Sequence, residues 1–498
     1  MEKEAEIRAR SRLVLAAALT LSLGIACSVS PDPRPNVLVI LTDDHAVSMM
    51  SAYGSTRAET PNIDRIANEG ALFRNSFVTN SICSPSRASL LTGKYSHANG
   101  VRENEATFDG SQLTFPKLLQ AAGYETALIG KWHLGSDPTG FDYWNILPGQ
   151  GSYRDPEMLE MGKRRQRKGY VTDVLTDDAL AWLRGRDRTK PFLLMQHHKA
   201  PHAAWVPSED KSARFADERA ALPETFNANR SGRTGAVLKA SNRIVPDLLR
   251  RWILLGESFG KKAPDGLTGI ESREWLYQEY VRDYRRVLLS VDESVGRLLD
   301  YLDAEGLSEN TIVLYTSDNG LFLGEYGMVD KRLMYEESLR VPLAVRYPAT
   351  VERGSGIDAF ALNVDLAPTI LDFAGVVPSE RLHGRSLRGL LEGEPPVDWR
   401  RSLYYHYYEE AGYYNVTRHY GVRTERFKLI RYYGSYRTSS RTGETTGPVD
   451  EWELIDLQAD PHELRSVYAD PRYAKVVIEL KAELARLRKE LDVPADES

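Results

Sequence analysis

Cysteine is scarce in this sequence, because Cys27 and Cys83 are the only two in 498 residues. Positive charge is not in excess either: the formal net charge is −6, which argues against a nucleic-acid-binding surface, since such surfaces are normally basic. Internal repeats and low-complexity tracts are absent. A balance of 42% hydrophobic and 27% charged residues is ordinary for a globular protein. The length allows one large α/β domain plus a smaller one, or two to three average domains.

The N-terminal stretch predicts a targeting segment rather than a part of the fold. Three arginines precede an apolar run at residues 13–26, and its length of about fourteen residues is short for a membrane span but normal for a signal peptide. Small residues directly before Cys27 are typical of a bacterial lipoprotein cleavage site. We therefore expect residues 1–35 to be a signal and tether, and the protein to be an exported, periplasmic or cell-surface lipoprotein that touches a membrane only through its lipid. A retained buried helix is the alternative.

Lipidation of Cys27 leaves Cys83 as the only thiol of the mature domain. In an oxidising compartment a lone thiol has no disulfide partner and is a liability. A buried, inert cysteine is the ordinary explanation. However, Pro85 suits the first turn of a helix, which would place Cys83 at the positively polarised N-terminus, and Arg87 lies one turn further along. These neighbours favour a functional cysteine at an anion-binding position.

Four short apolar runs have the continuous hydrophobic character of strands that are buried on both faces. Each run ends in polar residues that can do chemistry. In open α/β sheets, ligands bind beyond the carboxyl ends of the parallel strands, so we expect these polar groups to meet at one edge. The runs are 37–41, followed by Asp43 and Asp44; 126–129, followed by Lys131 and His133; 192–195, followed by His202; and 312–315, followed by Asp318 and Asn319.

The order of the elements predicts an α/β fold with a large mixed, mostly parallel sheet sandwiched by helices over residues 36–394. Residues 203–280 are charge-rich and weakly periodic, which indicates an insertion over the active edge. Residues 395–498 contain short tyrosine-rich strand patterns and a final amphipathic helix, so we expect a small antiparallel α+β subdomain. The other helices are expected at residues 116–122, 170–183, 284–302 and 366–374.

The run from Cys83 to Gly93, with proline, arginine and Leu-Thr-Gly at fixed spacing, resembles the signature of type I sulfatases. The resemblance extends from about residue 35 to the C-terminus and implies the alkaline phosphatase-like fold. It also implies that Cys83 is oxidised before folding to formylglycine, through a transient encounter with the formylglycine-generating enzyme. The hydrate of that aldehyde would be the nucleophile. After the attack, the second hydroxyl of the hydrate would expel sulfate by elimination and restore the aldehyde. An ordinary cysteine or serine could not release sulfate in this way, so the mechanism requires the modification.

Asp43, Asp44, Asp318 and Asn319 form an all-oxygen set at two expected strand ends, which suits a hard cation such as Ca²⁺ or Mg²⁺. Any single Asp–Asp pair is more often a helix cap or a solvated turn. Sulfatases carry these residues at the matching places, and the resemblance adds the oxidised residue 83 as a further ligand. The cation would lower the pKa of the hydrate and neutralise charge on the sulfate.

Lys131, His133, His202 and Lys331 match further positions of the sulfatase family. A lone histidine is more often structural, but these histidines and lysines lie just beyond strand ends. The resemblance implies a double displacement in which Arg87 and the two lysines stabilise charge on the sulfonyl oxygens. His202, assisted by Lys331, would protonate the departing sugar oxygen, and His133 would take the proton from the second hydroxyl of the hydrate.

The C-terminal part is similar to bacterial sulfatases of the N-acetylglucosamine-6-sulfatase group around His406, Arg418 and His419. That resemblance implies a sulfated sugar substrate, either 6-O-sulfated N-acetylglucosamine or a glycosaminoglycan or mucin fragment. The three side chains could bind the sugar, and packing within the small sheet is an alternative of equal weight. The sequence departs from its relatives at Tyr326, where a histidine is often found, and at Asn319, a position that glutamine can take.

Two other functions stay open at the level of the sequence. A phosphate or phosphonate monoester hydrolase could use the same scaffold, although relatives with that activity generally alter the pocket residues. A catalytically inactive, lipid-anchored carbohydrate-binding protein is disfavoured by the intact set of metal ligands, histidines and lysines. Release of phosphate but never of sulfate would favour the first of these alternatives.

Overall fold

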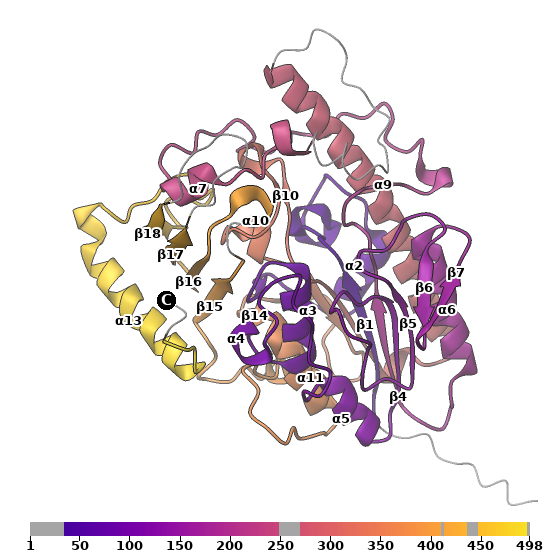
Figure 1. The fold of residues 1–498 in the computed structure, drawn as a ribbon. Helices are drawn as coiled ribbons and strands as arrows, with labels where there is room; N and C mark the ends of the chain where they lie inside the picture. The colour runs from indigo at the N-terminus through magenta and orange to yellow at the C-terminus, as the bar shows by residue number, and fades with distance from the viewer. Residues whose placement is uncertain (1–33, 249–268, 410–412, 436–446, 496–498) are drawn as a thin grey trace, which may run out of the picture.

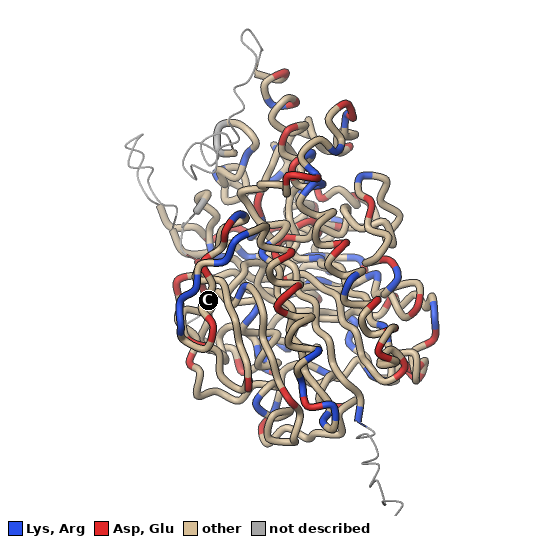
Figure 2. The backbone as a smooth tube through the Cα atoms, turned by 90° about the vertical axis from the view of Figure 1, so that its right-hand side faces the viewer, with Lys and Arg blue, Asp and Glu red and all other residues tan. Residues whose placement is uncertain are grey.

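The computed structural model describes residues 34–248, 269–409, 413–435 and 447–495. The expected signal segment and Cys27 lie outside these ranges. Within them, no helix combines the length and the apolar character needed to cross a membrane. Lys and Arg are interspersed with Asp and Glu along the backbone (Figure 2).

A ten-stranded mixed sheet forms the centre of the fold (Figure 1). Its strands lie in the order β13 (Ser355–Ile357), β2 (Ala71–Phe73), β12 (Leu343–Arg346), β9 (Thr311–Ser317), β1 (Asn36–Thr42), β8 (Phe192–His197), β4 (Glu125–Lys131), β5 (Tyr143–Leu147), β6 (Glu157–Glu160) and β7 (Lys163–Gln166). The strands from β9 to β5 are parallel to one another. Antiparallel pairings join β12 to β9 on one side and β6 to β5 on the other. The prediction of a large, mixed and mostly parallel sheet is confirmed.

Helices cover both faces of this sheet: α2 (Pro61–Asn68), α6 (Val171–Gly185) and α9 (Gly269–Ala304) on one face, and α3 (Cys83–Thr92), α5 (Phe115–Ala121) and α11 (Leu366–Phe373) on the other. Strand β1 shows why. Leu38 and Ile40 pack into the first cluster of helices, whereas Val37, Val39 and Leu41 pack into the second. All five side chains are fully buried, which explains why the strand is a continuous apolar run.

A second sheet of four antiparallel strands forms the C-terminal part, in the order β15 (Ser402–Tyr407), β16 (His419–Thr424), β17 (Phe427–Ser435) and β18 (Pro448–Asp456). The helix α13 (Ala474–Glu490) lies at the outer edge of the molecule beside these strands (Figure 1). Its Leu480, Leu484 and Leu487 pack among the tyrosines of the sheet. This is the small antiparallel α+β arrangement expected from residue 395 onward.

The helix α9 begins earlier than the sequence pattern predicts. We expected it at residues 284–302, whereas it begins at Gly269. The buried face of the helix continues back through Leu276, Tyr277, Tyr280 and Val281, and the Tyr280 ring lies 4.4 Å from that of Trp205. Tyrosine supplies half of this stretch, so its apolar period is less evident in the sequence, and the turn before it is exposed at Ile270. The remaining short elements are β3 (Ser76–Phe77), β10 (Phe322–Leu323), β11 (Val329–Asp330), β14 (Ala361–Leu362), α4 (Ser96–Asn99), α7 (Gly235–Lys239), α10 (Glu336–Leu339) and α12 (Arg388–Leu391).

Candidate active site

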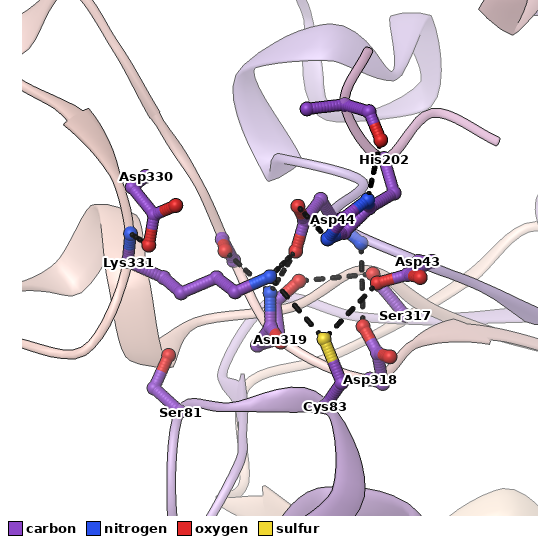
Figure 3. A network of polar contacts seen from close by, with 12 residues as sticks. Asp43, Asp44, Ser81, Cys83, His202, Ser317, Asp318, Asn319, Asp330 and Lys331 are labelled. Carbon is purple, nitrogen blue, oxygen red and sulfur yellow. Dashed lines mark hydrogen bonds and ion pairs between the residues drawn. The ribbon is translucent and has the colours of Figure 1, made fainter. Parts of the chain in front are cut away.

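Polar side chains from neighbouring strands meet at the carboxyl edge of the parallel part of the main sheet (Figure 3). The strands β9, β1, β8 and β4 are adjacent and parallel, so the residues that follow them lie side by side. These residues are Asp318 and Asn319 after β9, Asp43 and Asp44 after β1, His202 after β8, and Lys131 at the end of β4. The structure therefore brings together the residues that the four apolar runs indicated.

Cys83 is the first residue of α3 and is 1% exposed. Pro85 lies in the first turn of this helix, and Gly93, in the left-handed region, ends it. Cys83 Sγ lies 3.4 Å from Asp43 Oδ1 and 3.3 Å from Lys331 Nζ (Figure 3). Burial, with the nearby charge of Asp43, raises the pKa of the Cys83 thiol to about 12. The unmodified thiol is therefore protonated at neutral pH and is a poor nucleophile.

Arg87, one turn along α3 from Cys83, is held by two partners. Its Nε donates to Asp318 Oδ2 over 2.9 Å, and its Nη1 donates to the carbonyl oxygen of Lys131 over 2.6 Å. Its Nη2 lies 2.9 Å from Asp318 Oδ2 and 3.9 Å from Asp43 Oδ2. The side chain is 1% exposed, so its guanidinium is a fixed positive charge among the carboxylates.

Two buried lysines neutralise two of these carboxylates. Lys131 Nζ pairs with Asp43 Oδ2 and also donates to Gln150 Oε1 over 2.6 Å. Lys331 follows β11, and its Nζ pairs with Asp44 Oδ1. The two ammonium groups reach the site from strand β4 and from the loop after β11, so different parts of the chain hold them in place.

Asp43, Asp44 and Asp318 offer carboxylate oxygens that all lie within 4.8 Å of one another. Asn319 Nδ2 donates to Asp44 Oδ1 over 2.6 Å, and among the described residues its buried Oδ1 has no hydrogen-bond partner. The oxygen and nitrogen of a side-chain amide are told apart only by their hydrogen bonds. Rotating the Asn319 amide by 180° would place its oxygen beside the three carboxylates. An all-oxygen set with an orphaned acceptor fits a hard divalent cation.

The pKa values of the three carboxyl groups show the need for a counter-charge. Burial and the neighbouring Asp43 raise the pKa of Asp318 to about 7, and burial raises the pKa of Asp44. Burial also acts to raise the pKa of Asp43, but Lys131 and other neighbouring cations hold it well below its ordinary value. A divalent cation would keep all three groups ionised.

His202 is buried, with its two ring nitrogens in different environments. Its Nδ1 lies 2.7 Å from the carbonyl oxygen of Ala203, so this nitrogen carries the proton. Its Nε2 faces the carboxylates, 3.8 Å from Asp44 Oδ2 (Figure 3). Burial lowers the pKa of His202 well below its ordinary value. The ring is neutral and presents Nε2 to the site.

His133 is half-buried and lies next to the start of α3. Its Nδ1 lies 3.2 Å from Ser84 Oγ, and its Nε2 lies 3.1 Å from Gln150 Nε2. Burial, together with the charge of Lys131, lowers the pKa of His133 to about 2. This ring is therefore neutral as well.

Gln150 is a site residue that the sequence analysis did not identify. It contacts both Lys131 and His133 from the loop after β5. The glycines on either side, Gly149 and Gly151, have left-handed φ values of 54° and 66°. The Gly-Gln-Gly pattern was the available signal, because two glycines around one polar residue indicate a turn that presents that residue.

His406 and His419 lie inside the C-terminal sheet among tyrosine rings. The ring nitrogens of His406 bond to the hydroxyls of Tyr404 and Tyr433 at 2.8 and 2.7 Å. The His419 ring is fully buried and stacks on a tyrosine. Arg418 is half-buried just before β16. The two histidines thus make the contacts of packed residues, and sugar binding by the three side chains stays a prediction.

Comparison with known proteins gives two family matches. Residues 35–376 match the family described as Sulfatase, and residues 324–490 match the family described as N-sulphoglucosamine sulphohydrolase, C-terminal. The N-acetylglucosamine-6-O-sulfatase of Bacteroides thetaiotaomicron is 43% identical over 495 residues, which cover 91% of this chain and 86% of that protein. The human N-acetylglucosamine-6-sulfatase is 30% identical over 413 residues, which cover 77% of this chain and 68% of that protein.

The solved structures add a neighbour with a bound sugar. The neighbour, BT4656 in complex with its substrate D-glucosamine-2-N, 6-O-disulfate, has a TM-score of 0.85 to this chain and 43% sequence identity. The alignment covers 93% of this chain and 99% of that one. The similarity therefore includes the main sheet, the site and the C-terminal sheet.

Proposed function

The chain belongs to the sulfatase family, and on that premise we propose that it removes the 6-O-sulfate of N-acetylglucosamine, free or within glycosaminoglycan or mucin fragments. It is a sulfuric ester hydrolase that acts on carbohydrate. Two comparisons support the choice of sugar and position. The 43% identical protein is an N-acetylglucosamine-6-O-sulfatase, and the similar solved structure holds a 6-O-sulfated glucosamine.

The observation that carries the proposed chemistry is the position of residue 83, at the N-terminus of α3 and between Asp43 and Lys331. We propose that Cys83 is converted to formylglycine, which supplies a hydrate nucleophile that can expel sulfate and return to the aldehyde. The side chain is 1% exposed in the folded chain, so the formylglycine-generating enzyme would have to act before folding. Oxidation also removes a thiol whose pKa of about 12 makes it unreactive.

Asp43, Asp44, Asp318 and Asn319, with the oxidised residue 83, would hold Ca²⁺ or Mg²⁺. The cation would supply positive charge that lowers the pKa of the hydrate and neutralises the sulfate. In the protein alone, three carboxylates are balanced by one arginine and two lysines. A divalent cation would therefore leave the site positive, as an anionic sulfate ester requires.

The side chains of the site have separate tasks in this proposal. Arg87, Lys131 and Lys331 bind the sulfonyl oxygens and stabilise their charge, because all three are buried and fixed by carboxylates. His202 takes up a proton at Nε2, while its Nδ1–H stays on the Ala203 carbonyl, and then delivers the Nε2 proton to the departing sugar oxygen. His133 accepts a proton at Nε2 from the second hydroxyl of the hydrate.

We further propose that the chain is exported and lipid-anchored at Cys27. This proposal is supported by the arginines, the apolar run and the small residues before that cysteine. An enzyme on the outside of the cell would meet sulfated glycans directly. Membrane contact would come from the lipid alone.

Sulfate release from a panel of esters tests the proposed substrate. We expect the purified, oxidised enzyme to act fastest on 6-O-sulfated N-acetylglucosamine and more slowly on 3-O-sulfated and N-sulfated glucosamine. The Cys83→Ala variant should release no sulfate from any of these esters. Preference for another sulfate position would contradict the proposed linkage. Phosphate release from N-acetylglucosamine-6-phosphate without any sulfate release would favour the phosphate or phosphonate ester hydrolase instead.

A further inference from the structure

Gln150 joins two groups of the active site through a single side-chain amide. Its Oε1 accepts a hydrogen bond from Lys131 Nζ over 2.6 Å, and its Nε2 lies 3.1 Å from His133 Nε2. Because an ammonium group only donates, Lys131 holds the oxygen of the amide on its own side. The NH₂ group must then point at His133, where it meets the ring nitrogen as a donor.

The other ring nitrogen of His133 specifies the same arrangement of protons. Ser84 Oγ lies 2.6 Å from the carbonyl oxygen of His133 and 3.3 Å from that of Asn104, so its hydroxyl hydrogen is donated to a carbonyl. Ser84 Oγ is then left to accept from His133 Nδ1, 3.2 Å away. The contacts of both ring nitrogens thus indicate a hydrogen at His133 Nδ1 and a lone pair at His133 Nε2.

We propose that Gln150 is a positioning residue that fixes the neutral Nδ1–H tautomer of His133, so that Nε2 is the atom that accepts a proton. This inference rests on the proposed function, because it takes His133 to be the proton acceptor. Lys131 is the anchor of the arrangement: its charge orients the Gln150 amide, and the amide orients the ring. Gln150 is exposed and lies between two left-handed glycines, and in this proposal the second hydroxyl of the hydrate replaces its amide at Nε2.

Two variants separate this role from simpler ones. Gln150→Glu keeps an oxygen that accepts from Lys131, but a carboxylate has no hydrogen to donate to His133 Nε2 and instead favours a proton there. Gln150→Met keeps the length of the side chain and loses both contacts. Gln458→Glu is the matched control, because Gln458 is also exposed, lies outside the site and receives the same change of charge.

Steady-state kinetics on 6-O-sulfated N-acetylglucosamine provide the first readout. We expect kcat to fall by about 100-fold in both Gln150 variants, since each removes the donor that keeps Nε2 as the base, while KM stays close to that of the wild type. Gln458→Glu should behave as the wild type. Wild-type kcat in Gln150→Glu would mean that the contact with Lys131 is all that Gln150 provides, and would overturn the inference. A change confined to KM would overturn it too, because Gln150 would then be a sugar contact.

The tautomer itself is the second readout and needs no substrate. ¹⁵N spectra of protein labelled at its ten histidines, with His133 assigned by the loss of its signals in His133→Asn, should show a protonated Nδ1 and a bare Nε2. Gln150→Glu should move the proton to Nε2. A wild-type ring with the proton on Nε2 would overturn the inference. Failure of the proposed function is distinct, because it would appear as oxidised wild-type enzyme that releases no sulfate, whatever the spectra of His133 show.

Discussion

Lys331 Nζ lies 3.3 Å from Cys83 Sγ, although the two residues are 248 positions apart in the chain. The ammonium is buried and anchored by its ion pair with Asp44, so it cannot swing away from residue 83. A fixed positive charge beside this position stabilises a negative oxygen on residue 83 or on an ester bound to it. The start of α3 and the loop after β11 thus form one reaction centre.

Binding of a divalent cation should stabilise the folded protein. After removal of metal with EDTA, Ca²⁺ at about 100 times its Kd should raise the free energy of unfolding by about 2.7 kcal/mol, which is measured as an increase in Tm. Asp318→Asn should lose most of this increase because it removes one charge from the cluster. Asp372→Asn, on the exposed side of α11, should keep it. A Tm that responds to neither Ca²⁺ nor Mg²⁺ would contradict the cation site.

His202→Asn should impair the hydrolysis of sugar sulfates far more than that of aryl sulfates. A sugar alkoxide is a poor leaving group and needs a proton, which His202 delivers from Nε2 once the ring is protonated there, whereas 4-nitrophenolate leaves without one. We expect kcat on the 6-O-sulfated sugar to fall by about 10²- to 10⁴-fold, with little change on 4-nitrophenyl sulfate. The aryl substrate controls for folding and metal content in the same sample. Equal losses on both substrates would assign His202 another role.

Acid should destabilise the fold through His419. Burial lowers its pKa to about 4 from an ordinary value of 6.5, so between these values the unfolded chain binds more protons. The stabilisation is complete above pH 6.5 and is lost as the pH falls toward 4, by up to about 1.4 kcal/mol per pH unit. Urea unfolding of His419→Phe should therefore depend less on pH than that of the wild type. Tyr432→Phe, in the same sheet, should keep the wild-type slope; equal slopes in His419→Phe and wild type would refute the prediction.

The ion pair between Arg233 and Glu453 ties the expected insertion to β18. It is fully buried and bidentate, with Nε–Oε1 and Nη2–Oε2 distances of 2.9 and 2.6 Å. Glu453→Met should cost about 3–5 kcal/mol because it leaves a buried charge without a partner. The double variant Arg233→Met/Glu453→Met should be more stable than Glu453→Met alone, as measured by urea unfolding. A double variant with the sum of the two single losses would show that the pair is not coupled.

The sequence was informative about the strands and less so about the contacts between distant segments. Strands such as β1 were predictable because burial on both faces requires a continuous apolar run. The two-residue strands β10 and β11 carry no such pattern, yet they position Lys331. The first turns of α9 were missed because Ile270 is exposed and tyrosines supply much of the buried face that follows, so the apolar period is weak in the sequence.

Some site residues could likewise be predicted from the sequence, and others depend on contacts between distant segments. The carboxylates could be placed together because β1 and β9 end at one edge of a parallel sheet. The approach of Lys331 to Cys83 depends on tertiary packing, and only the family resemblance implied it. Gln150 was missed because its flanking glycines indicate only a turn, whereas its role arises from its two partners, Lys131 and His133.

The mass of the tryptic peptide 75–87, which contains residue 83, tests the central claim most directly. Protein made together with a formylglycine-generating enzyme should yield this peptide with an aldehyde in place of the thiol, and sulfate release should rise in proportion to the oxidised fraction. Full turnover of the sulfated sugar by protein whose peptide retains an unmodified Cys83 thiol would contradict the account.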